Sequence, residues 1–184
     1  MPTVSLVDAS QAPLLAQAYY AAGDPGPLVT ALAHVPEVLD VALPFIGTVL
    51  GESAIDLRTK EIVILRTSVV QECRYCTQTH TAVACDADLS LAEVQALRGE
   101  TAITGAFTDA RELALLGWVD AVALGPGTPD PALAAGLRAH FADHEIVELT
   151  LLVGATLMLN RFATSLGLPT SPATLERLAE ENLV

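Results

Sequence analysis

The chain has 184 residues, which is enough to bury a full core in one domain and crowded for two. Nine basic residues against 22 acidic ones give a formal charge of −13, and such a surface repels phosphate backbones and anionic lipid. This balance argues against nucleic-acid and membrane partners. Hydrophobic residues make up 52% of the chain and aromatic residues only 4%, so Ala, Leu and Val must build the core. So much apolar surface on a small acidic chain indicates burial between the subunits of a homo-oligomer.

Features near the two ends of the chain predict a cytoplasmic protein. The segment Met1 to Asp8 has no basic region followed by an apolar stretch, so no secretory signal is expected. The apolar run Leu151 to Leu159 is far shorter than the roughly 20 residues of a membrane-spanning helix. Three cysteines are too few and too clustered for a disulfide scaffold, and a Cys-x-x-Cys in a reducing compartment is more often catalytic or metal-binding.

Capping residues and helix breakers predict the first elements. Ser10 can cap a helix that runs to Ala22, and the Gly- and Pro-rich segment 23–27 ends it. Pro36 fits the first turn of a helix that continues through Val49.

The next predicted elements carry the chemistry. The segment Leu57 to Val70 looks helical, and a new helix should begin near Cys73 and carry His80. Ser90 with Glu93 then makes a capping box before a short helix.

The C-terminal part completes an all-helical pattern. Thr108 can cap a helix from Asp109 to Leu124, Asp143 can cap a long helix to Ser165, and Ser171 starts a last one. No stretch alternates with period two between turn residues, so no sheet is expected. We therefore predict an all-α fold, a single domain over residues 1–184. The missing βαβ pattern argues against a thioredoxin-like protein.

A short internal sequence similarity, the internal echo, would fit a fold of two pseudo-repeated halves. The segments Lys60 to Leu65 and His144 to Leu149 share Glu-Ile-Val-x-Leu at an offset of 84 residues. Extended, this alignment pairs Cys76 with Asn160, so a second copy would lack the thiols. Five shared positions leave coincidence as an equal alternative.

The segment Glu72 to His80 carries the clearest chemical signal. Cys73, Cys76 and His80 stand at i, i+3 and i+7, and a helix would place them on one face. A dithiol at this spacing can close to a disulfide and reopen, and a neighbouring imidazole can move the protons of that cycle. A free thiol is only slightly ionised at neutral pH, because its pKa is about 8.5. A place in the first turn of a new helix and the imidazole one turn beyond Cys76 would both favour the thiolate.

Glu61 lies 12 residues before Cys73, in the predicted helix Leu57 to Val70. A carboxylate in the first turn of an apolar helix is easily explained by the helix dipole, or by an ion pair with Arg58 or Lys60. Followed by this dithiol and imidazole, Glu61 is also a candidate for the far end of a proton relay.

The pattern of Glu61 followed by Cys-x-Tyr-Cys-x-x-x-His resembles the alkylhydroperoxidase D group of the carboxymuconolactone decarboxylase family. The best match spans Arg58 to Asp86, and a weaker likeness continues in Asp143 to Leu149 and in Leu159 to Phe162. The resemblance implies an all-helical, oligomeric peroxidase, a trimer or hexamer, with no metal and no bound organic cofactor. Decarboxylase members of the wider family lack the paired cysteines, so lactone decarboxylation is the less expected activity.

The resemblance also implies a separate role for each of the site residues. Cys76 would attack the terminal peroxide oxygen and become a sulfenic acid, and Cys73 would condense with it to release water and form a disulfide. Glu61 and His80, with a water molecule, would shuttle the protons. An outside dithiol would then reduce the disulfide, and in the family that reductant is a lipoyl group on a carrier protein.

Tyr75 is the departure from the family pattern, which more often has Cys-x-His-Cys. A tyrosine cannot shuttle protons near pH 7 as a histidine can, so the rate and the preferred peroxide are open.

The paired cysteines also suit two roles outside redox chemistry. They can be buried small hydrophobes, since free cysteine is among the most buried residue types. They can also bind zinc with His80, but no fourth Cys or His follows at a short spacing, and structural zinc is almost always four-coordinate. A c-type haem would need a histidine where Thr77 stands.

The remaining candidates are assigned structural roles. Cys85 lies about half a turn around the helix from Cys76 and should pack away from it. Arg161 follows Asn160 at the end of an apolar helix, where a cation stabilises the terminus or pairs with a carboxylate. The three other histidines stand in ordinary helical or capping contexts: His34, His140 and His144.

The sequence therefore predicts a homo-oligomeric thiol peroxidase that reduces organic hydroperoxides or hydrogen peroxide through a Cys73–Cys76 disulfide. Two alternatives stay open, a general dithiol oxidoreductase and a structural protein whose dithiol senses redox state by changing its assembly.

Overall fold

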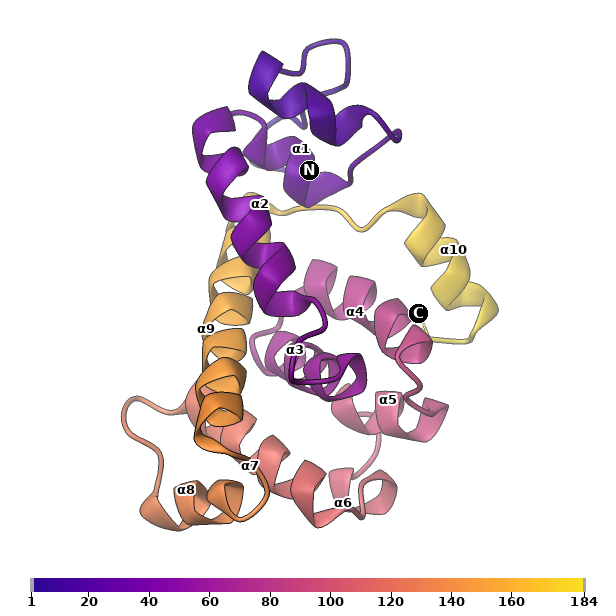
Figure 1. Ribbon diagram of the computed structural model, residues 1–184. Coiled ribbons are helices and arrows are strands. Elements are labelled where there is room, and N and C mark those ends of the chain that lie inside the picture. Colours follow the sequence, from indigo (N-terminus) through magenta and orange to yellow (C-terminus); the bar gives the residue numbers. More distant parts are fainter. Residues whose placement is uncertain (1, 184) are drawn as a thin grey trace.

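The computed structural model describes residues 2–183, and within this range helices are joined by turns and loops with no strand, so the fold is all-α, as predicted (Figure 1). One 3₁₀ helix, η1, and ten α-helices follow one another: η1 Leu14–Tyr20, α1 Pro27–Leu32, α2 Pro36–Leu50, α3 Leu57–Val70, α4 Arg74–Asp86, α5 Leu91–Leu97, α6 Ile103–Ala106, α7 Ala110–Leu124, α8 Pro131–Arg138, α9 Asp143–Leu166 and α10 Pro172–Glu180.

Helix α3 lies at the centre of the molecule, with α4, α7 and α9 packed around it (Figure 1). Burial follows from its sequence, because Ile62 to Leu65 is an unbroken apolar run that presents aliphatic side chains to every side. These four residues are at most 1% exposed and form the middle of the largest hydrophobic cluster. Any polar side chain on α3 that faces this core is therefore held in a fixed, largely water-free setting.

Helix α9 runs along the molecule beside α2 (Figure 1). By length and composition it is the one helix of residues 2–183 that could cross a membrane. Its inner face is packed on α3 and α7, and that face includes the polar residues Thr156 and Asn160. These contacts give α9 the place of a core helix in this fold.

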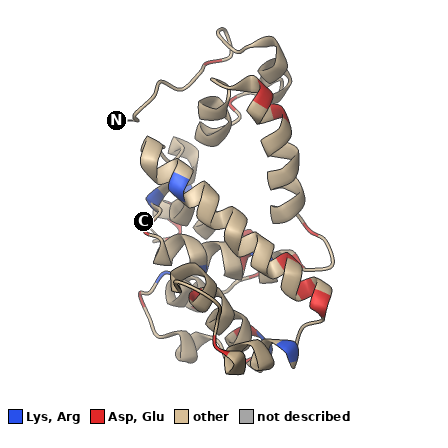
Figure 2. Ribbon diagram, turned by 90° about the vertical axis from the view of Figure 1, so that its left-hand side faces the viewer, with Lys and Arg blue, Asp and Glu red and all other residues tan. Residues whose placement is uncertain are grey.

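The outer surface of α2 and α9 carries few charged residues along most of its length (Figure 2). Exposed apolar side chains recur at helical spacing on both helices, and the most exposed are Val41 at 72% and Val147 at 68%. We call this surface the α2/α9 face, and define it by Val38, Val41, Phe45, Val147, Leu151 and Met158.

A fully buried ammonium group joins α2, α3 and α9. Lys60 on α3 donates from Nζ to the carbonyl oxygen of Val49 at 2.9 Å and to that of Gly51, where α2 ends. The same Nζ lies 2.8 Å from Oε1 of Glu148 on α9. Because the last carbonyls of a helix have no partner within it, this lysine both caps α2 and holds it against the other two helices.

The N-terminal segment differs from the prediction. Instead of a helix capped by Ser10, the chain forms a turn there, since Ser10 donates from its backbone N–H and its hydroxyl to Oδ1 of Asp8. Pro13 then precedes the short 3₁₀ helix Leu14–Tyr20. Local hydrogen bonds to the Asp8 side chain thus take the place of the first helical turn.

Two predicted caps are shifted by one residue and the capping box is confirmed. Asp109, not Thr108, caps α7 by accepting from the backbone N–H of Arg111 at 2.7 Å. Asp143 is the first residue of α9 and Ala142 is its cap residue, whose N–H donates to Glu145. Ser90 and Glu93 form the reciprocal box at α5, and Ser171 caps α10.

Candidate active site

The site is built at the break between α3 and α4. Helix α3 ends at Val70, Glu72 takes a left-handed backbone conformation with φ of 54°, and α4 begins at Arg74. Cys73 is thus the cap residue of α4, and its Sγ accepts from the backbone N–H of Cys76 at 3.4 Å. An amide of the first turn aimed at this sulfur favours an anion there, as expected from the sequence.

Cys73 and Cys76 are joined by a disulfide, with their Cα atoms 5.3 Å apart. Cys73 is fully buried and Cys76 is 6% exposed. Cys85 is free and packs against the main hydrophobic cluster, and burial raises the pKa of its thiol. The geometry pairs the two cysteines of the motif and leaves the third apart.

His80 and Glu61 form a hydrogen bond across the two helices, with Nδ1 2.9 Å from Oε2. Glu61 is only 4% exposed, and it lies in the second turn of α3 rather than the first, so the helix dipole does not account for it. Because a carboxylate accepts, it holds the proton on Nδ1 and leaves Nε2 of a neutral imidazole able to take up another.

The neighbouring cations that could have paired with Glu61 make their ion pairs elsewhere. Arg58 pairs with Glu93 and with Glu112, the latter at 3.0 Å. Lys60 pairs with Glu148. Glu61 therefore pairs with His80 and not with these neighbouring cations.

A cavity of about 170 Å³ lies between α2, α3, α4 and α9. Cys76 and His80 line it, together with four polar residues that the sequence did not single out for function, Ser68, Thr79, Thr156 and Asn160. The rest of its wall is mostly apolar, with Leu28, Ile46, Leu50, Ile64, Leu159 and Ala163. The cavity thus brings a sulfur and an imidazole to one small, mainly apolar space.

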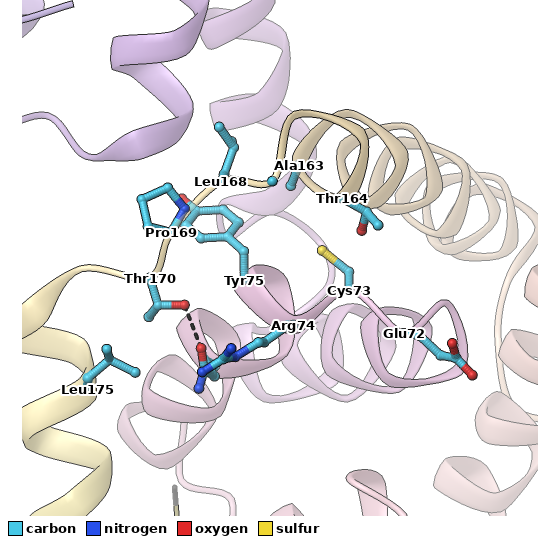
Figure 3. Close-up of a pocket in the computed structure, with 12 residues that line it drawn as sticks. Glu72, Cys73, Arg74, Tyr75, Ala163, Thr164, Leu168, Pro169, Thr170 and Leu175 are labelled. Atoms are coloured by element: carbon cyan, nitrogen blue, oxygen red, sulfur yellow. Dashed lines mark hydrogen bonds between the residues drawn. The ribbon is translucent and has the colours of Figure 1, made fainter. Parts of the chain in front are cut away.

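Cys73 lines a different hollow, of about 400 Å³, between the start of α4, the end of α9 and the segment before α10 (Figure 3). Arg74 and Glu72 stand at this hollow with Leu168 and Pro169 (Figure 3). Thr170 donates to Gln78 at 2.6 Å and ties the segment before α10 to α4 (Figure 3). The two cysteines of one disulfide therefore line two separate spaces.

Tyr75 lines both spaces, and burial raises the pKa of its phenol. It therefore stays protonated at neutral pH. Tyr75 acts here as a wall between the cavity and the hollow.

The other polar candidates lie in structural contacts. Nε2 of His34 lies 2.7 Å from the carbonyl oxygen of Ser5. Arg161 donates to Oε1 of Gln71 at 3.1 Å, and α9 continues past it to Leu166, so it does not mark the helix end. Within residues 2–183, no three side chains of His, Cys, Asp or Glu are grouped so as to hold a metal ion.

The sequence reasoning missed Ser68 and Asn160. Their contact joins residues 92 positions apart, with the hydroxyl of Ser68 donating to Oδ1 of Asn160 at 3.2 Å. The available signal was a polar Asn160 beside the apolar run Leu151 to Leu159.

Residues 36–121 match the Carboxymuconolactone decarboxylase family. Over these residues the chain is similar to this family. The match covers α2 through most of α7 and contains the dithiol, His80 and Glu61. Among curated proteins, no significant sequence match is found.

Solved structures show where this fold recurs. A putative antioxidant defence protein AhpD from Agrobacterium tumefaciens is 29% identical, with a TM-score of 0.68, over 77% of this chain and 95% of that one. A peroxidase-related protein with an alkylhydroperoxidase AhpD core from Ralstonia eutropha JMP134 has a TM-score of 0.82 at 16% identity, with 94% of each chain covered.

The debrominase Bmp8, solved with 2,3,4-tribromopyrrole, has a TM-score of 0.75 at 16% identity, over 98% of this chain and 97% of that one. At 16% identity such a likeness shows the fold alone. The family match over residues 36–121 and the shared fold together support an enzyme.

Proposed function

We propose that this protein is a thiol peroxidase that reduces hydroperoxides through the Cys73–Cys76 dithiol. One observation carries the proposal: Cys76 and His80 line the same small cavity, and the imidazole is held from behind by the buried carboxylate of Glu61. A nucleophile, a base within one helical turn and a group that orients the base are the arrangement that activates a thiol.

In the first step, Nε2 of His80 takes the proton of the Cys76 thiol. The thiolate attacks the terminal oxygen of the hydroperoxide, so an S–O bond forms and the O–O bond breaks. The leaving alkoxide takes the proton back from His80 and departs as an alcohol. Cys76 is then a sulfenic acid, two electrons more oxidised than the thiol.

In the second step, the sulfur of Cys73 attacks that of Cys76, an S–S bond forms as the S–O bond breaks, and hydroxide leaves as water with the proton that the Cys73 thiol gives up. The Cys73–Cys76 pairing in the structure is the connectivity that this step would produce, which supports the proposal. An external dithiol returns both sulfurs to thiols and becomes a disulfide itself.

The hollow that Cys73 lines supports an entry for the external dithiol separate from the peroxide cavity, and Cys73, which is fully buried, must be uncovered on that side before it is attacked. Attack on Cys73 from that side makes Cys76 the leaving thiolate, next to His80, which can protonate it. A slender dithiol arm such as a lipoyl group on a carrier protein suits a hollow of about 400 Å³. This arrangement keeps the reductant out of the path of the peroxide.

Steady-state peroxide consumption tests the proposal. Purified protein is supplied with tert-butyl hydroperoxide or hydrogen peroxide, and with dihydrolipoamide, dithiothreitol or reduced thioredoxin in turn. The proposal expects continuous turnover with at least one dithiol, abolished in Cys76→Ser. Disulfide exchange without peroxide turnover would favour the general dithiol oxidoreductase, and a single oxidation with a shift in assembly would favour the redox sensor.

A further inference from the structure

Asn160 is a buried hydrogen-bond donor without a protein partner at the reaction cavity. Its side chain is in the C-terminal half of α9, and the residue is 1% exposed. Within residues 2–183, Nδ2 of Asn160 is one of three buried side-chain atoms that lack a hydrogen-bond partner, and the only one of them at this cavity. Buried polar groups are nearly always paired, so an open donor at a cavity indicates a ligand that pairs it.

The amide of Asn160 is hydrogen-bonded to α3 through its oxygen. Ser68 on α3 is fully buried and donates its hydroxyl to Oδ1 of Asn160 at 3.2 Å. Since one side of the amide is held by α3, the N–H₂ side is the one left for the cavity that Cys76 and His80 also line. The donor is thus set in place before a substrate arrives, at no cost of reorganisation during the reaction.

We propose that Asn160 binds the substrate and stabilises its leaving oxygen, and that the substrate is a small, uncharged alkyl hydroperoxide. The inference rests on the proposed peroxidase function. When Cys76 attacks the terminal oxygen, negative charge develops on the oxygen bound to carbon. The N–H of Asn160 donates to that oxygen without transferring its proton, and His80 supplies the proton that completes the alcohol.

The lining of the cavity restricts the substrate. Its volume of about 170 Å³ is well below the roughly 300–1,000 Å³ of sites for drug-sized ligands. The wall around Asn160 holds no Lys or Arg that could bind the carboxylate of a fatty-acid hydroperoxide. A short or branched alkyl group fits the aliphatic side chains, while a charged tail would lose its hydration without a partner.

The test separates oxygen recognition from general reactivity of Cys76. In a Cys73→Ser background, Asn160→Leu keeps a side chain of similar size and removes the donor. We expect the rate of sulfenic acid formation with tert-butyl hydroperoxide to fall at least about tenfold, because single donors to developing oxyanions contribute about 10²–10³ in rate. Alkylation of Cys76 by methyl iodide should be unchanged, since iodide is not an oxyanion.

Two further variants complete the test. Ser68→Ala keeps Asn160 but removes the hydroxyl that holds its Oδ1. We expect the rate of sulfenic acid formation to fall less than in Asn160→Leu, and the rate of alkylation by methyl iodide to stay unchanged. Thr67→Val is the matched control, because the hydroxyl of Thr67 is also buried and unpartnered but is not at the cavity. Its peroxide rate should equal that of the Cys73→Ser parent.

Each negative result has a separate meaning. A folded Asn160→Leu protein with the parent's peroxide rate would overturn the role of Asn160, and so would equal losses with peroxide and methyl iodide. Preference for a fatty-acid hydroperoxide over tert-butyl hydroperoxide would overturn the substrate class. A Cys73→Ser parent that forms no sulfenic acid with either peroxide would overturn the proposed function itself.

Discussion

At the scale of single residues, the decisive contact is the hydrogen bond between Glu61 and His80. Both side chains have polar neighbours close by in the sequence, yet the carboxylate is buried and directed at the imidazole. Burial of Glu61 strengthens this bond, because water competes little for the carboxylate. The hydrogen bond to Glu61 therefore occupies Nδ1 and leaves Nε2 as the nitrogen of His80 that can exchange a proton with Cys76.

Glu61→Gln tests that assignment. The amide keeps the shape of the side chain but removes the charge that stabilises the protonated imidazole. General acid–base groups contribute about 10²–10⁴-fold, so peroxide turnover should fall at least about tenfold. Circular dichroism and the melting temperature serve as the control for folding. Unchanged turnover in a folded protein would reduce Glu61 to a structural partner of His80.

At the scale of elements, α2 must be held against α3 and α9, because its residues Ile46 and Leu50 close one side of the cavity. Lys60 does this through the end of α2, and Glu148 balances its charge. The hydrogen bond from Lys60 holds the pKa of Glu148 below its usual value.

We predict that Glu148→Gln lowers the free energy of unfolding by about 1–3 kcal/mol, the cost of leaving a buried polar group poorly paired. Because the folded pKa of Glu148 is depressed, its contribution is present above the unfolded value of about 4.3 and is lost as the pH falls through the folded value. The difference between wild type and variant in urea melts should therefore shrink in acid. Glu180→Gln, at an exposed position on α10, is the control. Equal stability of Glu148→Gln and wild type at pH 7 would contradict the role of this ion pair.

The elements that the sequence predicted correctly are those with strong local signals. The helix Leu57–Val70 has the predicted bounds, and in the structure the side chain of Asp56 caps its start. The prediction of a first helix capped by Ser10 was wrong, because the side chain of Asp8 accepts a hydrogen bond from the backbone N–H of Ser10. Such competition is decided by one side-chain rotamer, which no periodicity reveals.

Only the part of the candidate site that is close together in the sequence could be predicted. The dithiol, His80 and Glu61 stand within 20 residues and in a recognisable pattern, so local spacing brought them together. The contact of Ser68 with Asn160 spans 92 positions and depends on how α9 crosses α3. The internal echo pairs Cys76 with Asn160, and both line one cavity, but a true repeat stays a prediction.

At the scale of the whole molecule, the α2/α9 face is an apolar surface left uncovered by the chain itself. Its side chains are exposed in the single chain, while most of the 22 acidic residues lie elsewhere (Figure 2). Contiguous apolar patches on soluble proteins mark interaction sites. We propose that a second copy of this chain covers the face, in keeping with the homo-oligomer that the composition predicts.

The double variant Val147→Glu, Leu151→Glu places two carboxylates on the α2/α9 face. In the proposed assembly, the second copy covers these carboxylates. We expect the assembly to dissociate to monomers in sedimentation velocity, because burying unpaired charges is costly. Leu124→Glu is the control, since Leu124 is 61% exposed at the end of α7 and outside the face. A monomeric wild type, or an assembly that survives both charges, would show that the face has another use.

The central claim is that Cys76 is the thiol that reacts with peroxide and Cys73 the one that resolves it. The most direct measurement is trapping of the sulfenic acid with a dimedone-type reagent after one equivalent of peroxide, in Cys73→Ser and in Cys76→Ser, read by peptide mass spectrometry. We predict labelling at Cys76 in Cys73→Ser and no labelling in Cys76→Ser, because only Cys76 shares its cavity with His80. Labelling of Cys73 in Cys76→Ser, with none in Cys73→Ser, would contradict the account.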